Sequence, residues 1–217
     1  MMPRSNLLAA VMIAAIALVA QPAAAGEIHF SAAPGTIVRD IGTAGEEFLI
    51  PRTTTHVRLD GRLFDPPIAV TPAGDGARHT VAGALAADFA DNLSGDPGRI
   101  AGGYAAAERA DLQRRLDSEV IGSNVDFYRS IDDLFYLGFA THKDHVIVLV
   151  DYRFAGNKRR SLAFTMTKED GRYVRSNALS GDPAFGVVFA AVWNDTYQPV
   201  PQQFSAYGEP TTEAATR

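Results

Sequence analysis

The chain has 217 residues, a formal net charge of −5 and no cysteine. The absence of thiols excludes disulfides, cysteine-ligated metals, a lipid-modified N-terminal cysteine and thiol nucleophiles. The mildly acidic balance argues against nucleic acid as a partner. The one basic cluster, Lys158-Arg159-Arg160, adjoins Gly156-Asn157 and is interpreted as a solvated turn rather than a phosphate site.

Residues 1–25 have the organisation of a cleavable secretion signal. Arg4 gives a positive start, an apolar run extends from Leu7 to Ala20, and Ala23-Ala24-Ala25 supplies an A-x-A cleavage site. A membrane anchor is the competing interpretation, which the short apolar core and Pro22 weaken. We therefore expect cleavage before Gly26, a periplasmic location and no membrane span after cleavage.

Residues 26–78 predict a β-rich segment of short strands separated by turns. The strand candidates are EIHF, TIVRDI, EEFLI, HVRL and PIAV, and glycine and proline residues interrupt them. HVRLDGRLF is interpreted as a hairpin with Asp60-Gly61 in a type I′ turn. The polar stretch at 71–79 predicts a boundary near residue 78, after which residues 79–197 form the main domain.

A helical block follows this boundary. Thr80 is a candidate N-cap for a helix over 81–93, and Asp96-Pro97 begins a second short helix. A third helix is predicted over 108–120, with Gly122-Ser123-Asn124 ending it, and its apolar face carries Leu112, Leu116 and Val120.

The apolar period then changes to two, which predicts strands. The candidates DLFYLGFA, DHVIVLVDYRF, RRSLAFTMT and RYVRSNAL are joined by connections short enough for hairpins. DPAFGVVFAAVW predicts a closing helix, and residues 198–217 predict a flexible tail. The segment LSGDP occurs at 93–97 and 179–183, and both copies place an aspartate, Asp96 or Asp182, where a helix N-cap is expected.

The segments at 84–116 and 146–176, with the TKEDGRYV turn, resemble the nuclear transport factor 2-like (NTF2-like, or SnoaL-like) superfamily. This resemblance implies an α+β roll, in which helices pack on a curved antiparallel sheet and enclose a cavity, here with an N-terminal β extension. A cystatin-like or other helix-on-sheet arrangement is the alternative. Such relatives include isomerases, dehydratases and cyclases as well as proteins that only bind, so the fold does not select a function.

Asp151 is the first candidate for chemistry. Strand alternation puts it on the face opposite Val148, Val150 and Tyr152. In an apolar cavity this carboxylate would serve as a general base. The Val/Tyr face is the more apolar one, however, so the favoured interpretation places Asp151 on the outer face, paired with Arg160 or Arg175.

The other candidates are aromatic and histidine residues. Tyrosine hydroxyls in a cavity can donate to a carbonyl oxygen, and the pocket candidates are Tyr104, Tyr128, Tyr136 and Trp193. His142, Asp144 and His145 are weak metal-ligand candidates, because no third ligand stands near the two histidines. His29 and His56 are isolated in the sequence. We expect neither a metal nor a cofactor.

Two functions remain open at this stage. The first is a non-catalytic periplasmic binding or accessory protein that uses its cavity or sheet face for a small apolar ligand or a protein partner, with a homodimer as a further possibility. The second is a cofactor-free isomerase or dehydratase acting on an apolar carbonyl compound, in which Asp151 and one of Tyr104, Tyr128 or Tyr136 transfer protons. The familiar hydrolase, zincin and nucleotide-binding motifs are missing from the chain, which favours the first.

Overall fold

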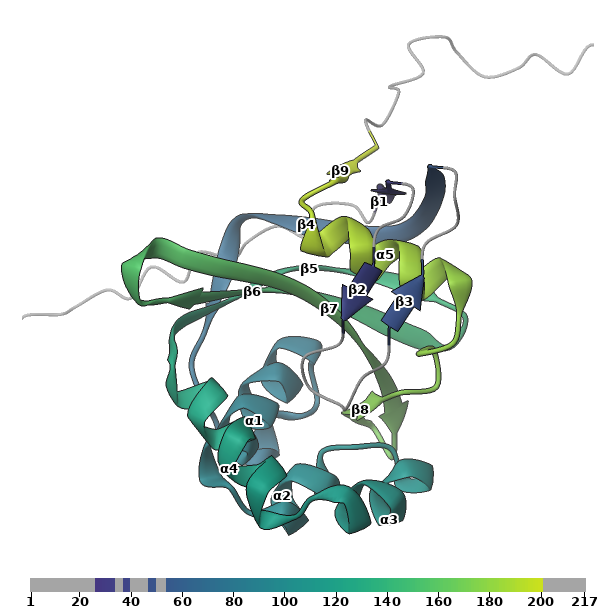
Figure 1. Ribbon diagram of the computed structural model, residues 1–217. Helices are drawn as coiled ribbons and strands as arrows, with labels where there is room; N and C mark the ends of the chain where they lie inside the picture. Colours follow the sequence, from purple (N-terminus) through teal and green to yellow (C-terminus); the bar gives the residue numbers. More distant parts are fainter. Residues whose placement is uncertain (1–25, 34–36, 40–46, 50–53, 201–217) are drawn as a thin grey trace, which may run out of the picture.

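The computed structural model describes residues 26–33, 37–39, 47–49 and 54–200 (Figure 1). The predicted signal peptide and residues 201–217 of the predicted tail lie outside this range. The strands are β1 (Gly26–Ala32), β2 (Ile37–Arg39), β3 (Glu47–Leu49), β4 (Thr55–Val70), β5 (Ile131–His142), β6 (His145–Phe154), β7 (Lys158–Glu169), β8 (Arg172–Ser176) and β9 (Tyr197–Pro199). The helices are η1 (Asp75–Ala77), α1 (Val81–Ser94), α2 (Pro97–Gly102), α3 (Ala106–Arg115), α4 (Ser118–Arg129), η2 (Ala155–Asn157) and α5 (Pro183–Trp193).

Seven strands form one antiparallel sheet in the order β8-β7-β6-β5-β4-β1-β9, and β2 and β3 pair separately. Helices α1–α4 lie against one face of the curved sheet and α5 lies against the other (Figure 1). This arrangement confirms the predicted α+β class with helices on a curved antiparallel sheet. β1 and β4, from the N-terminal segment, continue the same sheet, because β4 pairs with β5.

The two faces of β6 bury different side chains. Val148, Val150 and Tyr152 pack toward α1 and α4, and we call this side the α1–α4 face. Ile147 and Leu149 pack toward α5, on the side we call the α5 face. β6 is an interior strand of the sheet and is covered on both sides, which explains its continuous apolar sequence.

The predicted helix caps are confirmed. The Thr80 side chain accepts a hydrogen bond from the Gly83 amide at the start of α1. Asp96 accepts one from the Arg99 amide at the start of α2, and Asp182 accepts from the Ala184 and Phe185 amides at the start of α5. Both LSGDP copies therefore end in a capping aspartate followed by proline in the first helical turn.

The hairpin predicted at Asp60-Gly61 is wrong. β4 runs without a turn from Thr55 to Val70, and Gly61 pairs with Gly26 on one side and Ala140 on the other. A Cβ at Gly61 would lie 2.3 Å from the carbonyl oxygen of Phe139. The glycine thus serves a close approach of neighbouring strands rather than a turn. The Asp170-Gly171 turn between β7 and β8, in contrast, has positive φ at both residues (49° and 78°), as a tight hairpin requires.

The helix predicted over 108–120 is also corrected. α3 ends at Arg115, and Asp117 begins α4 by accepting hydrogen bonds from the Glu119 and Val120 amides. α4 then continues through Gly122-Ser123-Asn124, the segment expected to stop a helix. A capping aspartate outweighs the local preference of those three residues, and the Asn124 side chain donates to Asn92 of α1.

No helix in the described part of the chain is both long and apolar enough to cross a membrane.

Candidate functional site

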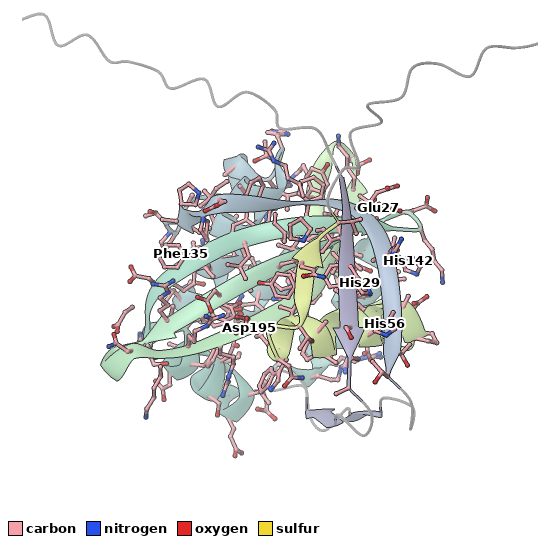
Figure 2. All side chains as sticks on the ribbon, turned by 90° about the horizontal axis from the view of Figure 1, so that it is seen from above. Glu27, His29, His56, Phe135, His142 and Asp195 are labelled. Carbon is pink, nitrogen blue, oxygen red and sulfur yellow. The ribbon has the colours of Figure 1, made fainter. Side chains whose placement is uncertain are left out.

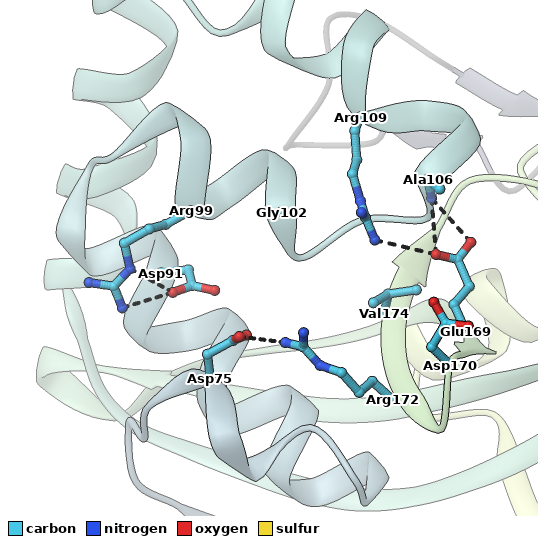
Figure 3. A pocket seen from close by; sticks show the side chains of 10 residues that line it. All are labelled: Asp75, Asp91, Arg99, Gly102, Ala106, Arg109, Glu169, Asp170, Arg172 and Val174. Carbon is cyan, nitrogen blue, oxygen red and sulfur yellow. Dashed lines mark hydrogen bonds and ion pairs between the residues drawn. The ribbon is translucent and has the colours of Figure 1, made fainter.

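A pocket of about 500 Å³ opens beside β8, between the α2–α3 corner, η1 and the β7–β8 turn (Figure 3). Its lining is strongly charged, with three arginines and four carboxylates among ten residues. We call it the arginine pocket, and it is lined by Asp75, Asp91, Arg99, Gly102, Ala106, Arg109, Glu169, Asp170, Arg172 and Val174. Its volume lies within the range of about 300–1,000 Å³ that is usual for ligand sites.

One wall of the pocket is an ion pair network centred on Asp91 of α1. The Asp91 side chain is only 6% exposed and accepts from the Nη2 of Arg78 at 2.6 Å. Arg99 places its Nε and Nη2 on the other carboxylate oxygen at 3.0 and 2.9 Å. Arg78 is fully buried, and its Nη1 has no hydrogen-bond partner among the described residues. A buried guanidinium requires carboxylate partners such as Asp91, because an unpaired charge in the interior is costly.

Asp75 joins this network to the sheet. It accepts from the Nε of Arg78 at 2.7 Å and from the Nη2 of Arg172 on β8. Burial on its own raises the pKa of the Asp75 carboxyl, but the hydrogen bonds from Arg78 and Arg172 outweigh it. The pKa is therefore lowered from its ordinary value, and the carboxylate is ionised at neutral pH.

The opposite wall is formed by Glu169 at the end of β7 and by the start of α3. Both Glu169 oxygens accept from the Ala106 amide at 3.1 Å, and Oε2 also accepts from the Nη2 of Arg109 at 3.3 Å (Figure 3). Arg109 donates its Nε to the Tyr104 carbonyl oxygen at 2.7 Å. The carboxylate thus binds a free amide of the first turn of α3, where negative charge is favoured.

Backbone hydrogen bonds to β8 fix the walls of the pocket. The Tyr173 amide donates to the Arg78 carbonyl at 2.8 Å, which holds the loop after η1. The Arg175 amide donates to Gly103, and the Ala105 amide donates to Arg175, each at 2.8 Å. These bonds hold the α2–α3 corner beside β8 like an additional short strand. The lining residues are therefore held in place before any ligand arrives.

The interior of the α1–α4 face contains a second polar cluster, around Arg175. Its Nη1 lies 3.1 Å from Asp88 of α1, and its guanidinium lies over the rings of Phe164 and Tyr104, at 4.1 and 5.6 Å from their centroids. The rings of Tyr128 and Tyr152 lie edge to face beside this ion pair, with centroids 6.5 Å apart. Burial raises the pKa of Tyr152 to about 12 and that of Tyr128 well above its usual range, so both phenols stay neutral.

The predicted tyrosines are thus only partly brought together. Tyr104 and Tyr128 meet at Arg175, whereas Tyr136 packs edge-on against Phe64, with ring centroids 4.9 Å apart. Burial raises the pKa of Tyr136 as well. Trp193 lies on α5, on the other face of the sheet, where it stacks on Phe189 and has Arg160 over its ring. The four aromatic candidates do not line a common pocket.

Asp151 lies on the α5 face, as the favoured interpretation had it, but it is buried (2% exposed). The prediction that Asp151 pairs with Arg160 or Arg175 was wrong. The carboxylate instead accepts from Ser161 at 3.1 Å and lies 3.3 and 3.4 Å from Arg153 and Arg159. Asp151 pairs in register with Phe135, and Figure 2 shows this face of the sheet with Phe135 and Asp195. The sheet therefore separates Asp151 from Tyr104, Tyr128 and Tyr136, and this set cannot act on one substrate.

The histidines occupy two places. His142 and His145 pair across the β5–β6 turn, with His142 3.2 Å from Asp182 and His145 3.5 Å from the Ser176 hydroxyl. Within the described ranges, no group of three or more His, Asp or Glu residues could hold a metal ion. His29 and His56, which look isolated in the sequence, lie on the adjacent strands β1 and β4 with ring centroids 5.1 Å apart (Figure 2).

Sequence reasoning did not find the residues of the arginine pocket. Asp75, Arg99, Arg109 and Arg172 look like ordinary surface charges when read along the chain. They come from four elements, η1, α2, α3 and the distant β8, and meet only where the α2–α3 corner pairs with β8. The polar stretch at 71–79, which predicts a boundary, is a local signal that contains Asp75.

No protein-family model matches the chain, and no curated protein matches its sequence. A search of solved structures finds partial similarity to a Campylobacter jejuni protein described as an NTF2-like transpeptidase, at 18% identity and a TM-score of 0.35. The match covers 45% of this chain and 98% of that protein. The architecture assigned above therefore stands on the order and pairing of the elements themselves.

Proposed function

We propose that the protein is an exported, periplasmic, non-catalytic binding or accessory protein that holds a charged ligand in the arginine pocket. Export rests on the sequence of residues 1–25. The binding role rests on the pocket, whose charged side chains are held by a fixed backbone frame.

One observation carries the proposal: three half-exposed guanidinium groups from different elements surround one hollow. The side chains of Arg99, Arg109 and Arg172 are 51%, 43% and 42% exposed. Within the described chain, Arg172 uses a single N–H group and Arg109 uses two, so both keep donors for a ligand. Guanidinium groups with unused donors are well suited to bind carboxylate or phosphate oxygens.

This lining favours a charged ligand over the small apolar ligand expected from the sequence. An apolar molecule would desolvate the paired charges without replacing their bonds to water, which is unfavourable. The enzyme alternative loses support for a separate reason, because its base and its tyrosines lie on opposite faces of the sheet. A protein partner and a homodimer remain as predictions.

Native mass spectrometry of protein isolated from the periplasm tests the proposal. We expect a mature chain that begins at Gly26 and a co-purified small ligand that is lost in the variant Arg172→Ala. This substitution removes only a partly exposed ion pair with Asp75, worth about 0–1 kcal/mol, so the variant should remain folded.

Arg114→Ala is the matched control, since Arg114 pairs with Asp111 on the exposed surface of α3 and does not line the pocket. The control should retain the ligand. A ligand that stays bound equally well to Arg172→Ala would contradict the assignment to this pocket. An uncleaved chain in the cytosol would contradict export.

A further inference from the structure

We infer that the ligand of the arginine pocket is a small dipolar molecule, with a carboxylate and an ammonium group at opposite ends, such as a short peptide with free termini. This inference rests on the proposed function and adds the chemical class of the ligand. It follows from the balance of charges in the pocket, from its unpaired carboxylate and from its size.

The balance of charges excludes a strongly anionic ligand. Three arginines line the pocket, but so do four carboxylates, and the buried Arg78 behind Asp75 and Asp91 brings the cluster close to neutrality. A polyanion would meet Asp91 and Glu169 as well as the arginines, and like charges at such distances repel. A ligand without net charge but with separated charges matches this lining.

Donors for the carboxylate end come from Arg172 and Arg109. Both keep N–H groups that no described residue accepts, and Figure 3 places their side chains on either side of Val174. Hydrogen bonds between guanidinium and carboxylate are charge-assisted and stronger than neutral ones. The guanidinium groups are already oriented by Asp75 and Glu169, so binding immobilises little additional side chain.

The acceptor for the ammonium end is Asp170. It is exposed in the β7–β8 turn, lines the pocket and makes no hydrogen bond or ion pair with any described residue. The other three carboxylates of the lining each bind an arginine. Asp170 therefore differs from them in having its full capacity available for a cationic group of the ligand.

The remaining lining suits a small backbone-like body between the two charges. Gly102 and Ala106 present little side chain, and Val174 provides a buried apolar surface. A volume of about 500 Å³ accommodates a molecule of dipeptide size rather than a long chain.

Isothermal titration calorimetry with the mature protein tests this inference, using four probes: L-alanyl-L-alanine, its N-acetyl form, its C-terminal amide and inorganic phosphate. We expect the free dipeptide to bind at least about tenfold more tightly than either blocked form, because each block removes one charge-assisted contact. Phosphate should bind more weakly than the dipeptide.

Two variants assign the ends of the ligand. Asp170→Asn keeps the size of the side chain, and asparagine tolerates the positive φ of 49°, so the turn should be preserved. The substitution should weaken the binding of the free dipeptide about tenfold and leave the binding of the N-acetyl form unchanged. Arg172→Ala should weaken the binding of the free dipeptide and leave the binding of the amide unchanged. The control variant Arg114→Ala should bind all probes as the wild type does.

Equal binding of free and blocked dipeptides would overturn the inference, as would a preference for phosphate. Absence of binding by every probe would overturn it too. The proposed function is judged separately: a co-purified ligand that depends on Arg172 but is not dipolar would leave the pocket as a binding site and refute only its chemical class.

Discussion

The helix that covers the α5 face of the sheet is made only of apolar residues, glycine and proline, whereas helix α1 on the other face contributes buried aspartates to ion pairs. The α5 face also buries Asp151, but the partners of Asp151 belong to the sheet itself. Between Pro183 and Trp193, α5 carries no polar side chain, and eight of its residues are buried. On the other face, Asp88 and Asp91 of α1 are buried and bind Arg175 and Arg78.

This difference separates stability from recognition. Apolar packing stabilises without needing a partner of matching geometry, while a buried ion pair roughly offsets its own desolvation and stabilises little in net terms. The α1–α4 side nevertheless keeps its charges, and the arginine pocket opens on that side. We infer that α5 stabilises the sheet by apolar packing and that the opposite layer orients charged groups.

The largest effect is expected from Asp91→Ala. This change leaves the fully buried Arg78 with one carboxylate partner fewer. We therefore expect a loss of about 4 kcal/mol in the free energy of unfolding. Urea denaturation of the variant measures it. Replacing both partners, with Arg78→Met and Asp91→Leu, should recover most of the loss, because neither charge of this pair is then left buried. A double variant as unstable as Asp91→Ala would show that the loss does not come from leaving Arg78 buried without its partner.

Leu149→Ala tests the α5 face. Leu149 is fully buried under α5, and its truncation should cost about 3 kcal/mol through lost apolar contact and an unfilled cavity. The same denaturation experiment applies. Binding to the arginine pocket should be unaffected in the folded variant. A variant that is stable but no longer binds ligand would show that the two faces are not independent.

Asp182→Ala removes the cap of α5 and should cost about 1 kcal/mol at neutral pH. The hydrogen bond from Lys143, assisted by the Phe185 and Ala184 amides and by His142, holds the pKa of the Asp182 carboxyl well below its usual range. Because the carboxyl has a lower pKa in the folded state, it stabilises the fold at pH values above its unfolded pKa of about 4. This stabilisation is lost as the pH falls further. The difference between wild type and variant should therefore shrink below about pH 4. Asp96→Ala, at the other LSGDP copy, is the matched comparison, since no lysine pairs with Asp96 in the described chain.

The smallest effect is expected from Arg99→Ala. Arg99 binds the same carboxylate as Arg78, but its side chain is 51% exposed, so its removal should cost less than about 1 kcal/mol. Comparing this variant with Asp91→Ala isolates the contribution of burial, because both changes break the Arg99–Asp91 pair. Similar losses in the two variants would mean that Arg78 does not need Asp91.

Local signals in the sequence predicted helix starts and tight turns correctly where the deciding contacts lie within a few residues of each other. Thr80, Asp96 and Asp182 cap helices through their own side chains, and the Asp170-Gly171 turn follows from backbone preferences. The errors arose where distant partners decide. Gly61 looks like a turn residue, but its lack of a side chain serves contact with β5.

The amino-acid sequence was sufficient to predict the starts of α1, α2 and α5, the succession of strands after residue 130 and the α+β class, because these depend on periodicity and capping within a few residues. The burial and the partners of Asp151, and the set of charges that meet in the arginine pocket, depend on tertiary contacts. Alternation placed Asp151 opposite Val148, Val150 and Tyr152, but it could not show that a helix also covers this second face of β6. The pocket depends on backbone bonds between the α2–α3 corner and β8, and these bring together residues separated by some 70 positions in the chain.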